Sequence, residues 1–235
     1  MERDELRRLA QQIPEAKIDE AVQRLKDLVD GDRFVFGVDL DGVVADYYTG
    51  LKPIAAEWLG VNVKKLPDEV SYGLPEWNME AAPGGYPALH RFAVKERNLF
   101  MGLKPMKDAP QVLRRLSEAG VRIRIITHRL YIKHFHRAAI DQTVEWLDTH
   151  DIPYWDLCFM QNKAAVGADL YIDDSIKNID DLMADGLDTI IFTNSTNRGH
   201  VGLRADSWQD VERIVTQKMA AWKKQRGAKK ALAGR

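Results

Sequence analysis

The spacing of apolar residues changes along the chain and divides it into regions of different structure. Over residues 2–30, apolar side chains recur every three or four positions in two stripes separated by Pro14, which predicts a helical extension over 1–33. After this extension, short runs of β-branched and aromatic residues alternate with helical patterns. The short runs predict five buried strands, at 33–39, 121–127, 155–160, 169–173 and 188–192.

Helical patterns follow most of these strands. They predict helices at 110–120, 132–149 and 175–185, and a last helix that begins after Ser207, a residue type favoured at helix N-termini. Strands that alternate with helices are typical of a parallel sheet covered on both faces. We therefore predict an α/β fold built on a doubly wound parallel sheet, with a Rossmann-like core.

The segment 47–104 interrupts this alternation between the first and second strands. It is rich in aromatic residues, Pro and Gly, and its helical patterns, at 49–59 and 87–97, are weak. Long segments beside an active site are usually functional. We therefore expect a small, mainly helical cap inserted after the first strand, with the core formed by 34–46 and 105–222.

The composition narrows the class of protein. Of 235 residues, 45% are hydrophobic and 29% are charged, and 34 Lys and Arg against 35 Asp and Glu give a formal net charge of −1. These values fit a globular protein in solution and do not favour nucleic acid as a partner. The tail at 223–235 has six Lys and Arg and no acid. It could contact nucleic acid or a membrane, but we expect a solvated, disordered end. The single cysteine, Cys158, excludes an intrachain disulfide and a thiolate zinc site.

The sequence has no apolar run long enough for a membrane helix, and its first residues are too charged for a secretory signal. We therefore expect a cytoplasmic protein that makes no membrane contact. The formation of a homo-oligomer stays open.

Polar residues follow the predicted strands, at the sheet edge where ligands bind in open parallel sheets. They are acids, a hydroxyl, an imidazole and an ammonium: Asp39 and Asp41 at the end of the first strand, Thr127 and His128 at the end of the second, Lys163 after the third, and Asp173 and Asp174 at the end of the fourth.

Each residue type has a physical reason to be there. Asp39 and Asp41 point to the same side of their strand, and Gly42 permits a sharp turn just after them. Carboxylates gathered at one point repel each other unless a cation lies between them, and hard oxygen ligands suit Mg²⁺. A carboxylate can attack phosphorus if the phosphoryl charge is neutralised, which Mg²⁺, Lys163 and Thr127 would do. Acids at strand ends also occur as ordinary turn and cap residues, but this order on successive strands favours phosphoryl transfer.

The sequence Asp39-Leu-Asp-Gly-Val-Val-Ala-Asp46 resembles the first motif of the haloacid-dehalogenase-like (HAD) phosphohydrolases. Thr127, Lys163 and the pair Asp173-Asp174 resemble the second, third and fourth motifs. The runs DLDGVVAD, ITHR and NLFMGLKPM, and the spacing from the lysine to the acidic pair, are most similar to the 5′(3′)-deoxyribonucleotidase branch. The resemblance spans roughly residues 34–195, strongly at the motifs and weakly across the cap.

The resemblance implies the catalytic and metal roles. Asp39 is the nucleophile and a Mg²⁺ ligand, and Asp41 is the general acid and base, whose backbone carbonyl also contacts the metal. Asp174 completes the metal site, while Asp173 supports it without binding the ion.

The resemblance also implies the phosphate site, which consists of Thr127, the backbone near His128, and Lys163. The chain departs from the branch at His128-Arg129, because small residues are common after the threonine of the second motif. This departure concerns the details of the substrate.

We therefore expect a Mg²⁺-dependent phosphomonoester hydrolase that acts through an aspartyl-phosphate intermediate. Asp41 favours phosphoryl transfer, because a dehalogenase needs no proton donor two residues after its nucleophile. The expected substrate is a small phosphorylated metabolite, with a nucleoside monophosphate favoured, cleaved to nucleoside and phosphate. Aromatic residues of the cap could stack on the base or simply pack the cap: Tyr72, Tyr86, Trp58 and Trp77.

Other functions stay open at this stage. The same chemistry would serve a phosphatase for sugar phosphates or other small phosphomonoesters. A receiver-like signalling domain uses similar residues, but its acidic pair comes from the first strand and its phosphorylated Asp from the third. A catalytically silent scaffold would have no need to keep Asp41.

Overall fold

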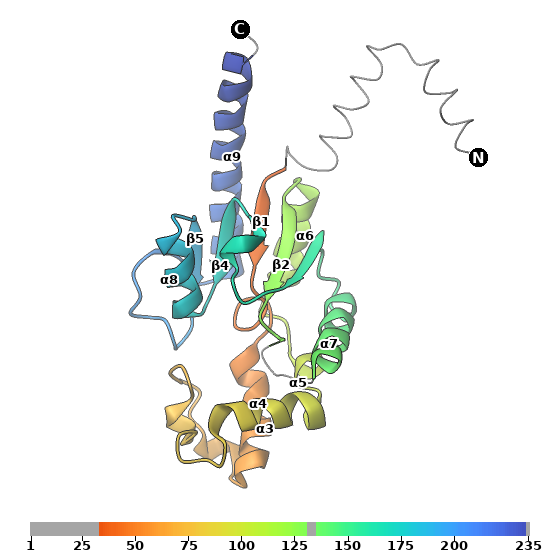
Figure 1. Cartoon of the computed structure of the whole chain (residues 1–235), viewed down its shortest axis with the longest axis vertical. Helices are drawn as coiled ribbons and strands as arrows, with labels where there is room; N and C mark the ends of the chain where they lie inside the picture. The colour runs from red at the N-terminus through yellow and green to blue at the C-terminus, as the bar shows by residue number, and fades with distance from the viewer. Residues whose placement is uncertain (1–32, 131–134, 234–235) are drawn as a thin grey trace, which may run out of the picture. The chain divides into compact units, whose positions relative to one another are not determined.

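The computed structural model describes residues 33–130 and 135–233, with side chains up to residue 227 (Figure 1). The chain divides into two units, 1–33 and 34–235, and the described residues belong almost wholly to the second. The predicted helical extension over 1–33 lies outside the described residues, except for residue 33. Residues 132–134 of the helix predicted at 132–149 also lie outside them.

Six parallel strands form one sheet, in the spatial order β3-β2-β1-β4-β5-β6. The strands are β1 (Val35–Val38), β2 (Arg122–Thr127), β3 (Asp156–Phe159), β4 (Leu170–Asp173), β5 (Thr189–Phe192) and β6 (Leu203–Ala205). The first five are the strands that the sequence predicts. The sequence does not predict β6, because it has three residues at the edge of the sheet and only Ala205 is buried.

The strand order excludes one alternative. Strand β1 pairs with β2 on one side and with β4 on the other. Receiver-like domains have the strand order 2-1-3-4-5, which places the third strand beside the first. The receiver-like interpretation is therefore wrong.

Helices cover both faces of the sheet, as a parallel sheet buried on both sides requires. They are α6 (Ala109–Glu118), α7 (His136–Thr149), α8 (Ile176–Ala184) and α9 (Trp208–Ala233). α6, α7 and α9 contribute to the large core on one face, and α8 packs on the other face, where Ile126, Tyr171 and Leu182 form a smaller cluster. Two hydrogen bonds between Ser207 Oγ and Asp210 cap α9 where the sequence predicts. The predicted doubly wound α/β fold is confirmed.

The segment between β1 and α6 folds over the carboxyl ends of the strands (Figure 1). It contains the α-helices α3 (Tyr47–Leu59), α4 (Gly85–Arg97) and α5 (Leu99–Gly102) and the 3₁₀ turns η2 (Val63–Lys65) and η3 (Pro75–Trp77). The two weak helical patterns of the sequence correspond to α3 and α4. The chain leaves and re-enters the core side by side, because Asp46 N donates to Lys104 O at 2.8 Å and Met106 N donates to Val44 O at 2.7 Å.

The basic tail expected to be disordered at 223–235 instead continues α9 as far as Ala233. The prediction of disorder was wrong because Ala, Lys, Gln and Arg are strong helix formers, and extending a helix that is already packed needs no new nucleus. Trp222, just before this extension, is fixed by a hydrogen bond from its Nε1 to Asp169 at 2.9 Å. Within the described parts of the chain, no helix combines the length and the apolar character that crossing a membrane requires.

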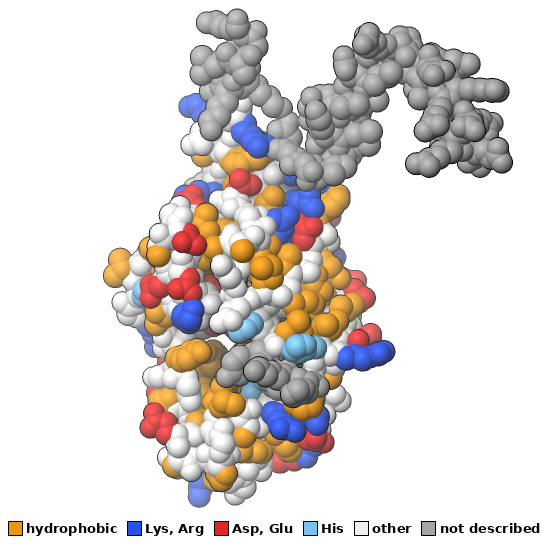
Figure 2. Space-filling view, in the orientation of Figure 1, with side chains coloured by type: hydrophobic (Ala, Val, Ile, Leu, Met, Phe, Trp, Pro, Cys, Tyr) orange, Lys and Arg blue, Asp and Glu red, His pale blue; other side chains and the backbone are white. Residues whose placement is uncertain are grey.

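The surface of the described residues mixes both signs of charge. On the face shown in Figure 2, Lys and Arg side chains lie interspersed with Asp and Glu side chains over the core and the cap. This face therefore agrees with the near-zero net charge of the sequence.

Candidate active site

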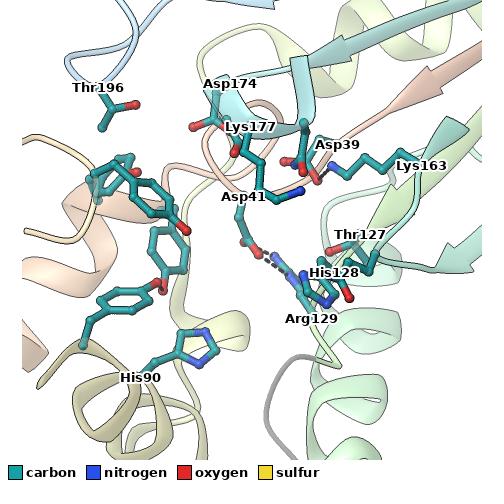
Figure 3. A pocket seen from close by; sticks show the side chains of 17 residues that line it. Asp39, Asp41, His90, Thr127, His128, Arg129, Lys163, Asp174, Lys177 and Thr196 are labelled. Atoms are coloured by element: carbon teal, nitrogen blue, oxygen red, sulfur yellow. Dashed lines mark hydrogen bonds and ion pairs between the residues drawn. The ribbon is translucent and has the colours of Figure 1, made fainter. Parts of the chain in front are cut away.

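The carboxyl ends of the strands and the cap enclose a cavity of about 340 Å³ (Figure 3). Most of the predicted site residues line this cavity: Asp39, Asp41, Thr127, His128, Lys163 and Asp174. Asp173 is not among the lining residues and lies completely buried behind them. The fold thus brings together side chains that are up to 135 residues apart in the sequence, from Asp39 to Asp174.

The turn after β1 places the two acids of the first motif. Three successive backbone N–H groups, of Val43, Val44 and Ala45, donate to the carbonyl oxygen of Leu40 at 2.8–3.2 Å. Gly42 has a φ of +86°, and a Cβ atom at this position would lie 2.1 Å from Oδ2 of Asp174. Only glycine therefore permits this turn to pass so close to the second acidic strand end.

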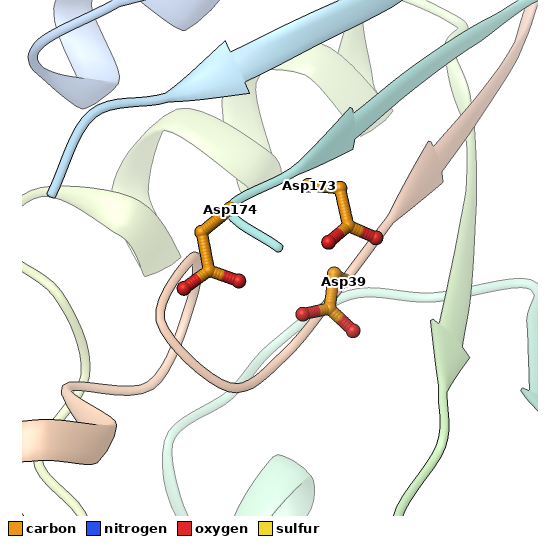
Figure 4. A group of neighbouring side chains, drawn as sticks. All are labelled: Asp39, Asp173 and Asp174. Carbon is orange, nitrogen blue, oxygen red and sulfur yellow. The ribbon is translucent and has the colours of Figure 1, made fainter. Parts of the chain in front are cut away.

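Three carboxylates gather beside this turn. Asp39, Asp173 and Asp174 each offer an oxygen, and these atoms lie within 4.8 Å of one another (Figure 4). All three side chains are buried. Burial and the repulsion of Asp39 raise the pKa of Asp174 well above its usual range.

Lys163 compensates for part of this negative charge. Its Nζ lies 2.6 Å from Oδ1 of Asp39 and 2.6 Å from Oδ2 of Asp173. Burial alone would lower the pKa of Lys163, but the two carboxylates raise it, so the group stays an ammonium. Burial raises the pKa of Asp39 to about 7 in spite of the attraction of Lys163. One ammonium for three carboxylates leaves an excess of negative charge.

Asp173 and Asp174 differ in their surroundings. The carboxylate of Asp173 accepts hydrogen bonds from Lys163, from the backbone N–H of Ser175 at 3.0 Å, and from Asn178. Asp174 lines the cavity and accepts a hydrogen bond from Asn194 Nδ2 at its Oδ2, at 2.6 Å. Asp174 is therefore the member of the pair with an oxygen available toward Asp39 and the cavity.

The donor set fits a magnesium ion. Mg²⁺ is bound in proteins by oxygen ligands and by only one or two carboxylates, and Asp39 and Asp174 present carboxylate oxygens from two strand ends. A divalent cation between them would offset the burial and the mutual repulsion that raise both pKa values. The glycine at position 42 leaves the space beside Asp174 open.

Sequence reasoning did not assign a role in the site to Arg129. Its guanidinium group is 1% exposed and binds both carboxylate oxygens of Asp41, at 2.7 and 3.0 Å. The guanidinium also lies 4.1 Å from the centre of the Phe100 ring and donates to Thr143 Oγ1 at 3.1 Å. The only signal in the sequence was the unusual His128-Arg129 pair after the threonine of β2.

Thr127 and His128 border the cavity at the end of β2. Thr127 is 1% exposed, and His128 lies on the same side as Lys163 and Lys177 (Figure 3). Partial burial and these two cations lower the pKa of His128, so the imidazole is neutral at neutral pH. Lys177, at the rim of the cavity, pairs with Asp181 at 2.6 Å.

The cap side of the cavity consists mainly of aromatic residues. Tyr47, Tyr48, Tyr72, Tyr86 and His90 line it, and the hydroxyl groups of Tyr47 and Tyr86 lie 2.7 Å apart. Burial lowers the pKa of His90 to about 4, so this imidazole is uncharged at neutral pH. The cap thus offers uncharged ring faces and hydroxyl groups opposite a charged core.

The structure separates the four aromatic residues that the sequence singles out. Tyr72 and Tyr86 line the cavity, and Tyr72 is 79% exposed. Trp77 is buried and donates from Nε1 to Pro67 O at 2.9 Å, and Trp58 does not line the cavity. The two tryptophans therefore pack the cap. Tyr47 and Tyr48 were missed, although both follow the first motif directly.

A parallel sheet of this order, with an Asp-x-Asp turn after β1, a threonine at the end of β2, a lysine after β3 and an acidic pair at the end of β4, defines a hydrolase of the HAD class. Two solved structures agree with this fold. A HAD-superfamily hydrolase, subfamily IA, from Geobacter sulfurreducens is 15% identical, with a TM-score of 0.51 over 79% of this chain and 97% of that chain. A haloacid dehalogenase-like hydrolase from Streptococcus pneumoniae is 12% identical, with a TM-score of 0.53 over 77% and 98%.

Sequence comparison identifies the family within this class. Residues 33–221 match the family described as 5′ nucleotidase, deoxy (pyrimidine), cytosolic type C protein. A protein of Chlorobaculum tepidum named "Putative 5′(3′)-deoxyribonucleotidase" is 55% identical over 181 residues, which cover 77% of this chain and 89% of that protein. The chain belongs to this nucleotidase family, and it is an enzyme, a phosphomonoester hydrolase.

Proposed function

We propose that the enzyme removes the phosphate from nucleoside monophosphates, with deoxyribonucleotides favoured, in a Mg²⁺-dependent reaction at Asp39. The observation that carries the proposal is the arrangement of Asp39 and Asp41. Both carboxylates line one cavity, between a core whose lining residues are charged or polar and a cap whose lining residues are mainly aromatic. The family and the name of its Chlorobaculum relative support the same substrate class.

Asp39 is the proposed nucleophile. A carboxylate oxygen of Asp39 attacks phosphorus, the bond between phosphorus and the sugar oxygen breaks, and an aspartyl-phosphate forms. Lys163 Nζ, 2.6 Å from Oδ1 of Asp39, keeps the nucleophile oriented and offsets the charge of the phosphoryl oxygens. Thr127 and the backbone near His128 hold these oxygens by hydrogen bonds.

Asp41 is the proposed proton carrier. In the first step its carboxyl group, after taking up a proton from solvent, gives that proton to the departing sugar oxygen and becomes a carboxylate. In the second step its carboxylate removes a proton from the water that attacks the aspartyl-phosphate, which releases phosphate and restores Asp39. Arg129 positions Asp41 for this second step, because it binds both oxygens of the ionised carboxylate.

Asp39, Asp174 and the backbone carbonyl of Asp41 are the proposed ligands of Mg²⁺, and Asp173 supports Lys163. The ion, when bound, neutralises the charge of the phosphoryl group during transfer. The near-neutral composition and the single cysteine support a cytoplasmic location.

A panel of substrates tests the proposal. Inorganic phosphate is measured with Mg²⁺ for deoxyribonucleoside monophosphates, ribonucleoside monophosphates and simple sugar phosphates. We expect the highest kcat/KM for nucleotides. Sugar phosphates hydrolysed about tenfold better than every nucleotide would contradict the substrate class and leave the chemistry intact.

The Asp39→Asn variant tests the chemistry itself. Deleting a covalent nucleophile is expected to lower kcat by at least about 10³-fold, while the far-UV circular dichroism stays that of the wild type. A variant that keeps about a tenth of the wild-type turnover would exclude Asp39 as the nucleophile.

A further inference from the structure

The loop after β5 contacts the acidic pair and the cap with adjacent residues. Asn194 Nδ2 donates to Oδ2 of Asp174 at 2.6 Å. The next residue, Ser195, contacts the cap, since its Oγ donates to Val70 O at 2.8 Å and accepts from Val70 N at 3.2 Å. Thr196, which follows, lines the cavity near Asp174 (Figure 3).

The orientation of the Asn194 amide is fixed by its other end. Its Oδ1 accepts hydrogen bonds from Thr196 N at 2.9 Å and from Thr196 Oγ1 at 2.7 Å. An oxygen that accepts two donors must face them, so the nitrogen faces Asp174. A carboxylate oxygen held in this way leaves the other oxygen of Asp174 directed toward the site.

Hydrogen bonds of Asn197 hold the loop to the ends of β4 and β5. Asn197 is 1% exposed, and its Nδ2 donates to the backbone oxygens of Asp174 at 2.9 Å and Phe192 at 2.8 Å. Arg204 donates to Oδ1 of Asn197 at 3.0 Å. These bonds fix the base of the loop, and the backbone N–H of Asn194 donates to Oδ1 of Asn197 at 3.2 Å. Beyond the loop itself, the side chain of Asn194 contacts Asp174 and that of Ser195 contacts the cap.

We propose that Asn194 is a positioning residue for Asp174 and that the cap, through Ser195, holds Asn194 in the geometry that a divalent cation requires. This inference rests on the metal site of the proposed function. Groups that orient a metal ligand contribute strongly to affinity, and their loss typically costs about 10–100-fold in metal binding. A cap that has moved away from Ser195 would therefore weaken the metal site, and binding of the ion and placement of the cap would favour each other.

The test measures Mg²⁺ binding directly, by isothermal titration of the whole protein without substrate. Asn194→Ala is expected to raise the Kd for Mg²⁺ by about 10–100-fold. Ser195→Ala removes two hydrogen bonds to the cap and is expected to raise it by roughly 2–10-fold. Thr196→Val keeps the side-chain volume and removes the hydroxyl that donates to Asn194 Oδ1. It should also raise the Kd for Mg²⁺, by less than Asn194→Ala does.

Ser71→Ala is the matched control. Ser71 lies next to Val70, but its hydroxyl donates to Glu76 within the cap, at 2.6 Å, so the Kd should stay within about twofold of the wild type. Thermal unfolding in excess chelator separates positioning from a general loss of structure, because a positioning role leaves the Tm of the metal-free Asn194→Ala variant near that of the wild type.

The outcomes are distinct. An unchanged Kd in both Asn194→Ala and Thr196→Val would overturn the role of Asn194. A raised Kd in Asn194→Ala with an unchanged Kd in Ser195→Ala would overturn the contribution of the cap. A wild-type protein that binds no Mg²⁺ would instead contradict the proposed metal site itself.

Discussion

The guanidinium group of Arg129 donates hydrogen bonds to both carboxylate oxygens of Asp41, at 2.7 and 3.0 Å, and the Arg129 side chain is buried. Asp41 itself is 26% exposed and faces the cavity. A bidentate pair of this kind fixes the direction of a carboxylate as well as its charge. The residue that departs from the common pattern of the second motif therefore acts on the proposed acid and base of the first.

Replacing Arg129 should separate catalysis from binding. We expect Arg129→Gln to lower kcat by about 10–100-fold while KM changes less than about threefold, because Asp41 loses its orientation and the phosphate site stays intact. Arg129→Lys keeps the positive charge but not the two parallel N–H donors of the guanidinium group. Its kcat should therefore lie between those of the wild type and Arg129→Gln. Steady-state kinetics on one nucleotide measures both constants. A Gln variant with an unchanged kcat would contradict the positioning of Asp41.

The two acids of the pair should have different roles, Asp174 as a metal ligand and Asp173 as a partner of Lys163. Excess chelator is expected to abolish activity and Mg²⁺ to restore it. Asp174→Asn should raise the Mg²⁺ concentration needed for half-maximal activity by more than about tenfold, whereas Asp173→Asn should mainly lower stability, since it leaves Lys163 with one carboxylate. Equal Mg²⁺ requirements in the two variants would contradict the assignment of Asp174 as the ligand.

The parts of the fold that the sequence predicts are those with a local pattern. Buried strands such as β2, and helices such as α8 with an apolar face, show their period within a few residues. β6 has only three residues at an edge, and the helical tail beyond Trp222 depends on an already packed helix. Neither feature has a local apolar signal.

The site is predictable to the same extent. Asp39, Thr127 and Asp174 lie at the ends of strands, and the ends of parallel strands meet at one edge, so their proximity follows from the order of the elements. The pairing of Arg129 with Asp41 joins residues 88 apart, and the contact of Asn194 with Asp174 depends on the path of a loop. These contacts require the three-dimensional structure.

The stability of the metal-free protein should fall as the pH rises. Burial raises the pKa of Asp39 to about 7, from the usual 3.8 of an aspartate. Between these values the folded state binds more protons than the unfolded state, so the free energy of unfolding decreases with increasing pH up to about 7 and then levels off for this group. Asp39→Asn should lack this contribution.

Thermal unfolding in excess chelator at pH 5 and pH 8 checks the prediction. The Tm of Asp39→Asn minus that of the wild type should be larger at pH 8 than at pH 5, and saturating Mg²⁺ should raise the wild-type Tm most at the higher pH. The comparison cancels the titration of groups that do not interact with Asp39. Asp39→Asn also removes the repulsion that helps to raise the pKa of Asp174, and this change acts on the Tm difference in the same direction. A Tm difference that is independent of pH would contradict a raised pKa of Asp39.

The cap should select the substrate through Tyr72. This ring lines the cavity and is 79% exposed, so it is free of a packing role in the cap and available to stack on a base. Stacking of a base on an aromatic ring contributes about 1–3 kcal/mol. We therefore expect Tyr72→Ala to lower kcat/KM for deoxyribonucleoside monophosphates by roughly 5–100-fold and to leave kcat/KM for simple sugar phosphates within about twofold. Trp155→Ala removes an aromatic side chain that is 54% exposed on the core and does not line the cavity, and it should change neither value. Equal losses for nucleotides and sugar phosphates would show that Tyr72 shapes the cavity and does not recognise the base.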